Sequence, residues 1–395
     1  MFALLRSSPQ LLPIVLVVFC VMMGMGMMVP VLPLFAEHHG GGPASAGLLL
    51  SAFGAARLAV NIPAGAGSER IGRRPVMILG VALLAIASFA AAASGSIAAL
   101  AMWLFVQGTG SSLYVTAAMA AVADLSGPSN RGRVMTLYQG AALVGISLGP
   151  AVGGVIAGRF GAPAPFVTQG ILAVLGAISA ALLVSETRTA TADGLRSDRG
   201  RSSRWGLLAQ GPFLAVCLVM FATFLARTVT NWQLVPWMAR ERFGFGPELV
   251  GLLLTAGSIA NFSVLPLVGR AIDTWGARAS IVLGSAVTII ALLVLASGQV
   301  ETAIWVGTAC LGVAGGIMAP ACAAFAIEVS QAGHGSTMGT LRMAGDIGLV
   351  IGPMLLGQIL SGTGLDQTGG LLIIAALVFG IAVVFAVASR TSFQR

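Results

Sequence analysis

The sequence predicts an all-α membrane protein whose twelve transmembrane helices form two pseudo-symmetric bundles of six. Composition, the length of the apolar runs and an internal repeat lead to this prediction. Hydrophobic residues make up 57% of the 395 residues and charged residues only 9%. A soluble domain of this size has about a quarter of its residues charged. We therefore expect the chain to lie in a lipid bilayer.

The apolar residues are gathered in runs that are long enough to cross a bilayer as a helix, which takes about 20 residues. Backbone polar groups cannot stay unpaired in lipid, so a spanning segment is either a helix or a strand of a closed barrel. The runs lack the alternation of barrel strands, which leaves helices. The twelve runs lie near residues 11–36, 46–66, 75–95, 97–123, 134–158, 165–185, 208–238, 248–268, 279–298, 301–327, 336–360 and 369–389.

A polar stretch divides the twelve runs into two sets of six. Residues 186–207 carry five arginines and little apolar content, which is typical of a flexible linker. We expect an N-terminal six-helix bundle in residues 1–185, a linker in residues 186–207 and a C-terminal six-helix bundle in residues 208–395.

Arginines predict the orientation, because the chain contains no lysine. Fifteen arginines lie in alternate connections, beginning with the N-terminal tail and including the linker. The loops on the opposite side hold only Arg159, Arg240 and Arg242. By the positive-inside rule both termini and the linker are cytoplasmic. The formal net charge of +8 is then a topological signal, and it calls for no nucleic-acid partner.

A charged glycine-rich cluster follows the second run and returns after the eighth. The first copy contains Gly65, Glu69, Gly72, Arg73 and Arg74. The second copy, 204 residues later, contains Gly269, Asp273, Gly276 and Arg278, with Ala277 where Arg73 would repeat. A constant offset over four positions indicates that the chain contains a duplication.

The fifth run carries a second pattern, in which a proline is surrounded by glycines. Proline removes a backbone donor and kinks a helix, while glycines in a row let a neighbouring helix approach closely. The residues are Gly145, Gly149, Pro150, Gly153 and Gly154, and their echo is Gly348, Gly352, Pro353 and Gly357 at an offset of 203.

These two patterns resemble signatures of the major facilitator superfamily of secondary transporters. The charged cluster matches the signature G-x-x-x-[DE]-R-x-G-R-R of the loop between its second and third helices. The pattern of the fifth run matches G-x-x-x-G-P-x-x-G-G, which marks the antiporter branch of the family. The resemblance covers the chain from end to end. It implies a carrier that exposes one site alternately to the two sides of the membrane.

The resemblance also implies a conformational latch. In the family, the acid at position 69 caps the start of the eleventh helix when one side is shut, and the arginine matching Arg73 pairs with an acid that ends the fourth helix, here Asp124. The counterpart of Asp124 in the second half is Glu328. The chain departs from the family by having Glu69 where aspartate is usual, and Ala277 predicts a weaker latch in the second half.

One element of the antiporter branch is absent. The fourth helix of that branch usually carries an arginine shortly before a Q-G-x-G run, and the arginine is implicated in proton coupling. Here the run begins at Gln107, and the arginine position is Leu104. The pattern of the fifth run therefore implies drug:proton antiport, although the arginine that is usually implicated in proton coupling is missing from the fourth run.

Four charged residues lie in the middle of predicted spans, where each costs about 2.5–3.5 kcal/mol on insertion scales. They are Arg57, Arg227, Arg342 and Asp346, and Asp346 is the sole acid deep inside a run. In the family fold the second and eleventh helices are neighbours across the cavity. This implies an ion pair between Arg57 and Asp346, with Asp346 as the proton carrier. The alternative is an i, i+4 pair between Arg342 and Asp346.

Two asparagines lie one turn from these arginines. Asn61 shares a helix face with Arg57, and Asn231 follows Arg227. We expect Arg57, Asn61, Arg227, Asn231, Arg342 and Asp346 to line the substrate cavity. Arg227 has no acid at similar depth in its own run, so it contacts either a polar or anionic substrate group or a gating partner.

Five methionines in the first run raise the alternative of a copper site, because thioethers are soft metal ligands. The run contains Met22, Met23, Met25, Met27 and Met28. No histidine or cysteine motif in the seventh or eighth run completes such a site, so we predict a flexible lining for apolar ligands and no metal. The four cysteines lie in apolar runs without a C-x-x-C spacing and are interpreted as buried small hydrophobes.

The function predicted from these observations is secondary active transport, namely proton-coupled efflux of a hydrophobic or amphipathic small molecule across a bacterial-type plasma membrane. The first alternative is an importer or exchanger of a small organic anion that uses Arg57 and Arg227. The second is a receptor or assembly factor without transport on the same scaffold. No enzymatic constellation, phosphate-binding loop or cofactor motif is present in the sequence, and a monomer is expected.

Overall fold

The computed structural model describes residues 10–125, 131–187, 210–298, 300–330, 334–363 and 365–389. Within these ranges the secondary structure is helical, with no strand. The predicted linker from residue 188 onward lies outside the described residues, as do the terminal arginines Arg6, Arg390 and Arg395.

The order of the helices follows the predicted runs. The first half contains α2 (Leu11–Met28), α3 (Leu32–His38), α4 (Pro43–Ile71), α5 (Arg73–Ala92), α6 (Ile97–Asp124), α7 (Arg131–Phe160) and α8 (Ala164–Leu183). The second half contains α10 (Gly211–Val229), the π-helical turn η2 (Thr230–Leu234), α11 (Val235–Phe243), α12 (Pro247–Ser297), α13 (Glu301–Val329), α14 (His334–Thr363) and α15 (Gln367–Ala388).

Ten helical segments of the described residues are long and apolar enough to cross a membrane. One of them, α12, is two helices joined at Gly276, where the backbone leaves the helical region. Helix α6 is not among the ten, because the polar run from Gln107 to Ser112 lowers its mean hydropathy, although it is 28 residues long. Each of the twelve predicted runs therefore overlaps a helix of the structure.

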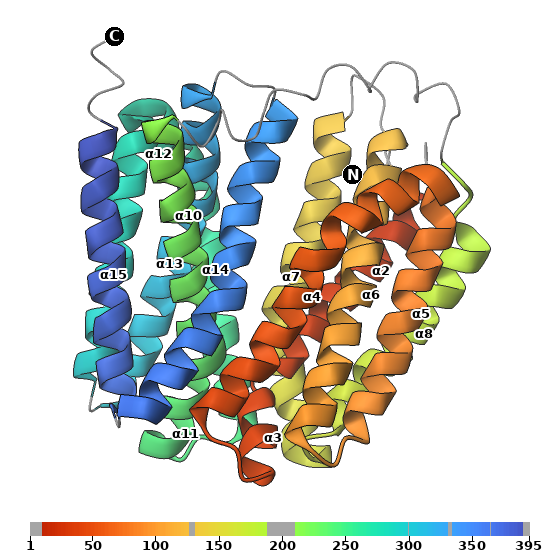
Figure 1. The fold of residues 1–395 in the computed structure, drawn as a ribbon, viewed down its shortest axis with the longest axis horizontal. Helices are drawn as coiled ribbons and strands as arrows, with labels where there is room; N and C mark the ends of the chain where they lie inside the picture. Colours follow the sequence, from red (N-terminus) through yellow and green to blue (C-terminus); the bar gives the residue numbers. More distant parts are fainter. Residues whose placement is uncertain are drawn as a thin grey trace. The chain divides into compact units, whose positions relative to one another are not determined.

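Contacts between Cα atoms divide the chain into two compact units. The first unit comprises residues 1–190 with 245–255, and the second comprises residues 191–244 with 256–395. In the first unit α2 packs against α7 and α8, and α6 packs against α4 and α5 (Figure 1). In the second unit α10 is in contact with α13, α14 and α15 (Figure 1). The first part of α12 groups with the first unit.

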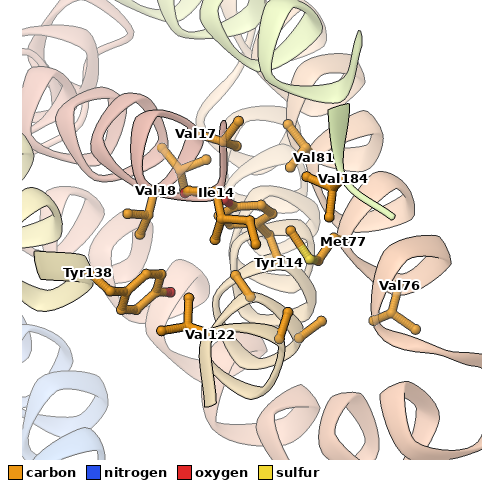
Figure 2. Packing of buried hydrophobic residues seen from close by; sticks show 14 of the residues in the cluster. Ile14, Val17, Val18, Val76, Met77, Val81, Tyr114, Val122, Tyr138 and Val184 are labelled. Atoms are coloured by element: carbon orange, nitrogen blue, oxygen red, sulfur yellow. Dashed lines mark hydrogen bonds between the residues drawn. The ribbon is translucent and has the colours of Figure 1, made fainter. Parts of the chain in front are cut away.

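The interior of the first unit is built around Tyr114, which is fully buried. Figure 2 shows its ring beside Ile14 of α2 and Met77 of α5. A phenol hydroxyl in an apolar interior needs a hydrogen-bond partner. Here it donates to the Ile14 carbonyl oxygen at 2.9 Å, which ties α6 to α2.

The interior of the second unit is apolar and contains two of the cysteines. Phe325 of α13 and Phe385 of α15 meet edge to face with ring centroids 5.0 Å apart, and Cys217 and Cys322 are buried in the same cluster. Lipid is as apolar as these side chains, so the cluster stabilises the unit through close packing.

Candidate functional site

The first copy of the charged cluster forms the turn between α4 and α5. Gly72 has φ 116° and ψ 159°, a conformation that is open almost only to glycine. It lies between the last residue of α4 and the first residue of α5. The turn therefore needs a glycine at this position for a backbone reason, independently of any role in transport.

Arg73 is buried behind this turn and joins three helices. Its Nε lies 3.2 Å from Asp124 Oδ2 at the end of α6, forming an ion pair. Its Nη1 donates to Ser68 Oγ at 2.8 Å, and Ser68 in turn donates to the Gly65 carbonyl at 3.0 Å. The structure thus brings together Gly65, Arg73 and Asp124, three of the predicted latch residues.

Glu186 completes the turn, and the sequence interpretation missed it by assigning it to the linker. Its Oε1 accepts from the Arg73 backbone nitrogen at 2.9 Å, and its Oε2 accepts from the Arg74 nitrogen at 3.2 Å. These two N–H groups open α5 and have no partner within the helix. A carboxylate at this position satisfies them and complements the helix dipole. The sequence signal was an acid placed directly after the sixth run.

Arg74 and Glu69, the two remaining residues of the first copy of the charged cluster, lie at the edge of the turn. Arg74 Nη2 donates to the Ala181 carbonyl oxygen near the end of α8 at 2.5 Å. Glu69 is exposed in the last turn of α4. Its expected target, the start of the eleventh helix, belongs to the second unit, so that contact stays a prediction.

The second copy repeats the backbone of the turn with different side chains. Gly276 has φ 84° and ψ 156°, and Arg278 Nη2 donates to the Ala386 carbonyl of α15 at 3.0 Å. Ala277 is buried against the apolar cluster of the second unit. Asp273 and Glu328 are both exposed.

The glycines of α7 are places where another backbone touches the helix. A methyl group added at Gly145, Gly149 or Gly153 would overlap backbone atoms of α2, at Phe19, Met23 and Met27 respectively. One added at Gly154 would overlap the Pro247 carbonyl of α12, in the segment that groups with the first unit. Close packing therefore explains these glycines in the first unit.

A hydroxyl from α12 enters the backbone of α7 beside Pro150. The Ala151 nitrogen donates to Thr255 Oγ1 at 3.1 Å, and the same hydroxyl donates to the Ser147 carbonyl at 3.1 Å. In a regular helix that nitrogen and that carbonyl would bond to each other, so Thr255 is inserted into the helix ladder. Thr255 lies 108 residues from Ser147, and no pattern in the sequence marks it as a partner of α7.

In the first unit, the predicted cavity residues Arg57 and Asn61 both have partners. Arg57 Nη1 lies 3.7 Å from Met25 Sδ, and its guanidinium carbon is 6.0 Å from the Phe53 ring centroid. Asn61 Oδ1 accepts from Ser112 Oγ of α6 at 2.6 Å. Leu104, at the usual arginine position, is buried among apolar residues.

The predicted cavity residues of the second unit lie on α10, η2 and α14. Arg227 is half-buried in the last turn of α10, and Asn231 lies in η2. On α14, Asp346 is half-buried and Arg342 is exposed. Arg342 makes no ion pair with Asp346 in the described part of the chain, so the i, i+4 alternative is not formed. The predicted pair of Arg57 with Asp346 joins the two units and stays a prediction.

Comparison with known proteins agrees with this architecture. Residues 14–233 and 216–393 match the model of the Major Facilitator Superfamily. Among relatives, Multidrug resistance protein 2 of Bacillus subtilis is 24% identical over 66% of this chain and 66% of its own length. Multidrug resistance protein 1 of Bacillus subtilis is 22% identical over 86% and 87%. Quinolone resistance protein NorA of Staphylococcus aureus is 21% identical over 61% of each. The chain thus spans somewhat less than two thirds of the first of these relatives.

Solved structures share the fold. A bacterial homolog of the human lysosomal transporter Spinster superposes with a TM-score of 0.81, at 17% identity, over 98% of this chain and 97% of its own. The nucleoside transporter NupG superposes with a TM-score of 0.80, at 14% identity, over 96% and 98%. The duplicated turns, the glycine-lined helix α7 and the family match lead to one conclusion: the chain is a multi-pass membrane protein that belongs to the Major Facilitator Superfamily.

Proposed function

We propose that the protein exports a hydrophobic or amphipathic small molecule by exchange for protons, from the cytoplasm across the plasma membrane. The single observation that carries the proposal is Asp346, the one carboxyl placed in the middle of an apolar span. A buried acid within a span is costly and marks a proton or substrate path. The relatives named for multidrug and quinolone resistance support the substrate class.

The proposed cycle uses residues from both six-helix bundles, residues 1–185 and 208–395, with the linker 186–207 and both termini in the cytoplasm. Asp346 pairs with Arg57 when it is ionised and releases Arg57 when it is protonated. Protonation thereby changes the relative energies of the two packings between which a carrier alternates. Asn61, Asn231 and Arg342 line the same path in this proposal, and the protein acts as a monomer.

The latch belongs to the same proposal. The turn residues Gly65, Glu69, Gly72, Arg73, Arg74 and Asp124, with Asp273, Arg278 and Glu328 of the second copy, stabilise one of the two packings. The glycines and proline of α7 supply the close, kinked contact of the antiporter branch. A carrier needs contacts that exist in only one of its two states.

Proton movement in proteoliposomes tests the proposal. The lumen holds a pH-sensitive dye, and the quinolone norfloxacin or the lipophilic dye Hoechst 33342 is added outside. Wild type should change the lumenal pH on addition of substrate, and Asp346→Asn should abolish the change. Glu301→Gln is the matched control, because Glu301 is exposed at the start of α13. Undiminished proton-driven transport in Asp346→Asn would remove Asp346 from the mechanism.

A second candidate function is exchange of small organic anions, and Arg227 favours it. No described residue pairs with its guanidinium. Anion exchange would need a counter-anion inside the vesicle and would move no protons. A receptor without transport would give no flux under either condition, so the same vesicles separate the three functions.

A further inference from the structure

The patch formed by Arg227, Thr230 and Asn231, here called the π-turn patch, has polar atoms that the fold leaves unused. Arg227 forms no hydrogen bond or ion pair with a described residue. Thr230 is fully buried, and its hydroxyl has no hydrogen-bond partner. Asn231 Oδ1 is buried and also unpartnered. Buried polar groups are nearly always paired, so such a cluster within one turn calls for an explanation.

The patch lies on the side of α10 that faces the interior of the second unit. Phe213, Val216 and Met220 are buried in the apolar cluster on this helix. Arg227 continues the same stripe, because positions separated by three, four and seven residues share one helix face. The exposed leucines Leu214 and Leu218 lie on the other side of the helix. A guanidinium in this position faces the interior of the protein.

The unpartnered side chains coincide with a π-helical turn. The Val235 nitrogen donates to the Thr230 carbonyl, an i to i−5 bond, and Pro236 follows without a donor of its own. Thr223, seven residues earlier on the same helix, uses its hydroxyl in the ordinary way and donates to the Val219 carbonyl at 2.8 Å. The Thr230 hydroxyl makes no such bond. Single π turns of this kind are frequent at functional sites.

The equivalent segment of the first unit has none of this chemistry. At the offset of 203 residues, Arg227, Thr230 and Asn231 correspond to Gly24, Met27 and Met28. There α2 ends at Met28 and the chain resumes as α3. The first unit therefore has a helix break at the position where the second unit has the π turn η2. Duplication therefore does not account for the polar residues, which belong to the second unit alone.

The chemistry of the patch selects the ligand. A guanidinium binds carboxylates with two parallel N–H donors, and a hydroxyl and an amide one turn away add neutral hydrogen bonds. No acid is present on α10 or η2 to compete for Arg227. We propose that the π-turn patch binds the carboxylate of an amphipathic substrate, so that the exported molecules are organic acids with an apolar body. This inference rests on the proposed function, because it assigns the substrate class of that transport.

Equilibrium binding of two matched probes tests the inference. Dansylglycine carries a carboxylate, and dansylglycinamide is its neutral analogue of nearly the same size and shape, with an NH2 donor in place of one carboxylate oxygen. Both accept excitation energy from tryptophan, and Trp232 lies within η2. In nanodiscs, wild type should bind dansylglycine at least about tenfold more tightly than the amide. Arg227→Gln should abolish that preference, Arg227→Lys should retain part of it, and Arg270→Gln, an exposed arginine on α12, should retain all of it.

Thr230→Val distinguishes a ligand site from a structural role. The replacement keeps the shape and removes an unpartnered buried hydroxyl, so the melting temperature without ligand should stay level or rise. Binding of dansylglycine should weaken severalfold while binding of the amide stays unchanged. A structural hydroxyl would give the opposite pattern, namely a lower melting temperature with an unchanged preference, and this would overturn the inference.

The remaining outcomes separate this inference from the proposed function. Equal binding of the two probes by wild type, or no binding of either, overturns the carboxylate site. Proton-coupled transport of the amide as fast as of dansylglycine overturns the inference and leaves the proposed function standing. A carboxylate preference that depends on Arg227, without any proton movement in proteoliposomes, supports the inference and contradicts the proposed function.

Discussion

The turns at Gly72 and Gly276 have nearly the same backbone and different side-chain anchors. Both glycines adopt a positive φ with an extended ψ. In both turns an arginine two residues later donates to a carbonyl near the end of the last helix of its half, Arg74 to Ala181 and Arg278 to Ala386. The duplication has preserved the backbone conformation and this one tether.

The turns differ in the residue directly after the glycine. Arg73 joins Asp124 and Ser68, and Glu186 caps the helix that Arg73 begins. Ala277 is packed into an apolar cluster instead. The glycine and the tethering arginine therefore build the turn, whereas the charge network around Arg73 is specific to the first half. Mutations at equivalent positions should therefore have unequal effects.

The largest loss of stability is expected at the glycines themselves. Alanine at either position must adopt a backbone conformation that costs about 1–3 kcal/mol. At Gly72 the new methyl would also overlap the Glu186 carboxylate, whereas nothing lies within 4 Å at Gly276. Displacing Glu186 removes the helix cap, worth about 1 kcal/mol more. Gly72→Ala should lower the free energy of unfolding by about 3 kcal/mol and Gly276→Ala by about 2 kcal/mol, measured by denaturation in detergent micelles. Equal losses would contradict the difference between the turns.

The next effect is expected at the arginines. Arg73→Ala leaves Asp124 without its cation and should cost about 2–3 kcal/mol, less than a fully buried pair because Asp124 is partly exposed. Arg278→Ala loses one hydrogen bond to a carbonyl and should cost about 1 kcal/mol. A double-mutant cycle with Asp124→Ala should give a coupling energy of about 1–2 kcal/mol. A coupling energy near zero would mean that Arg73 stabilises the turn through packing alone.

A smaller effect is expected for Glu186→Gln. The amide oxygen can still accept one backbone hydrogen bond, but the second bond and the negative charge at the start of α5 are lost. The free energy of unfolding should fall by about 1 kcal/mol. Glu328→Gln is the matched control, because Glu328 is exposed and should change stability by less than about 0.5 kcal/mol. If both variants lose the same free energy of unfolding, Glu186 does not stabilise α5 as a helix cap.

Sequence patterns predicted those parts of this architecture that depend on local chemistry. The apolar runs predicted the helices, because a span needs a certain length of apolar chain. The offset of 204 residues predicted that Gly276 would repeat the turn of Gly72. The α7 glycines predicted close approach of another helix, although the sequence alone did not identify α2 as the neighbour.

The features that escaped prediction depend on contacts between distant segments. Glu186 reaches Arg73 from 113 residues away, and composition placed it in a linker. Thr255 enters α7 from another helix, and nothing in its own neighbourhood marks it. The π turn had one local signal, Pro236, but a proline predicts a disturbed helix without deciding between a kink, a break and a π turn. At Pro33, the counterpart of Pro236 in the first half, the helix breaks between α2 and α3 and forms no π turn.

The smallest effect on stability is expected at Asp366. In the second unit an ion pair lies at the start of α15, between Asp366 and Arg242, and not at the turn of Gly276. Arg242 Nη2 donates to Thr368 Oγ1 at 2.6 Å and lies 3.5 Å from Asp366 Oδ2, and Asp366 accepts from the Gly369 nitrogen at 3.0 Å at the start of α15. The Gly369 hydrogen bond, with smaller contributions from Thr368 and Arg242, lowers the pKa of Asp366 below its usual value. A lowered pKa means that the ionised carboxylate stabilises the fold above the pKa of the unfolded chain, about 3.9. That stabilisation is lost as the pH falls through the folded pKa.

Because Asp366 is exposed, its charge should contribute less than about 1 kcal/mol. Asp366→Asn keeps a capping side chain and removes the charge, so its melting temperature should fall slightly below that of wild type at pH 6. The two curves should converge as the pH falls below about 3.9 and through the lowered pKa of the folded state, because the wild-type carboxyl then becomes protonated. Asp273→Asn, in the exposed second-copy turn, should follow wild type throughout. A pH-independent gap for Asp366→Asn would assign the effect to the shape of the cap rather than to its charge. The charges of the second unit would then stabilise it less than the Arg73 network stabilises the first.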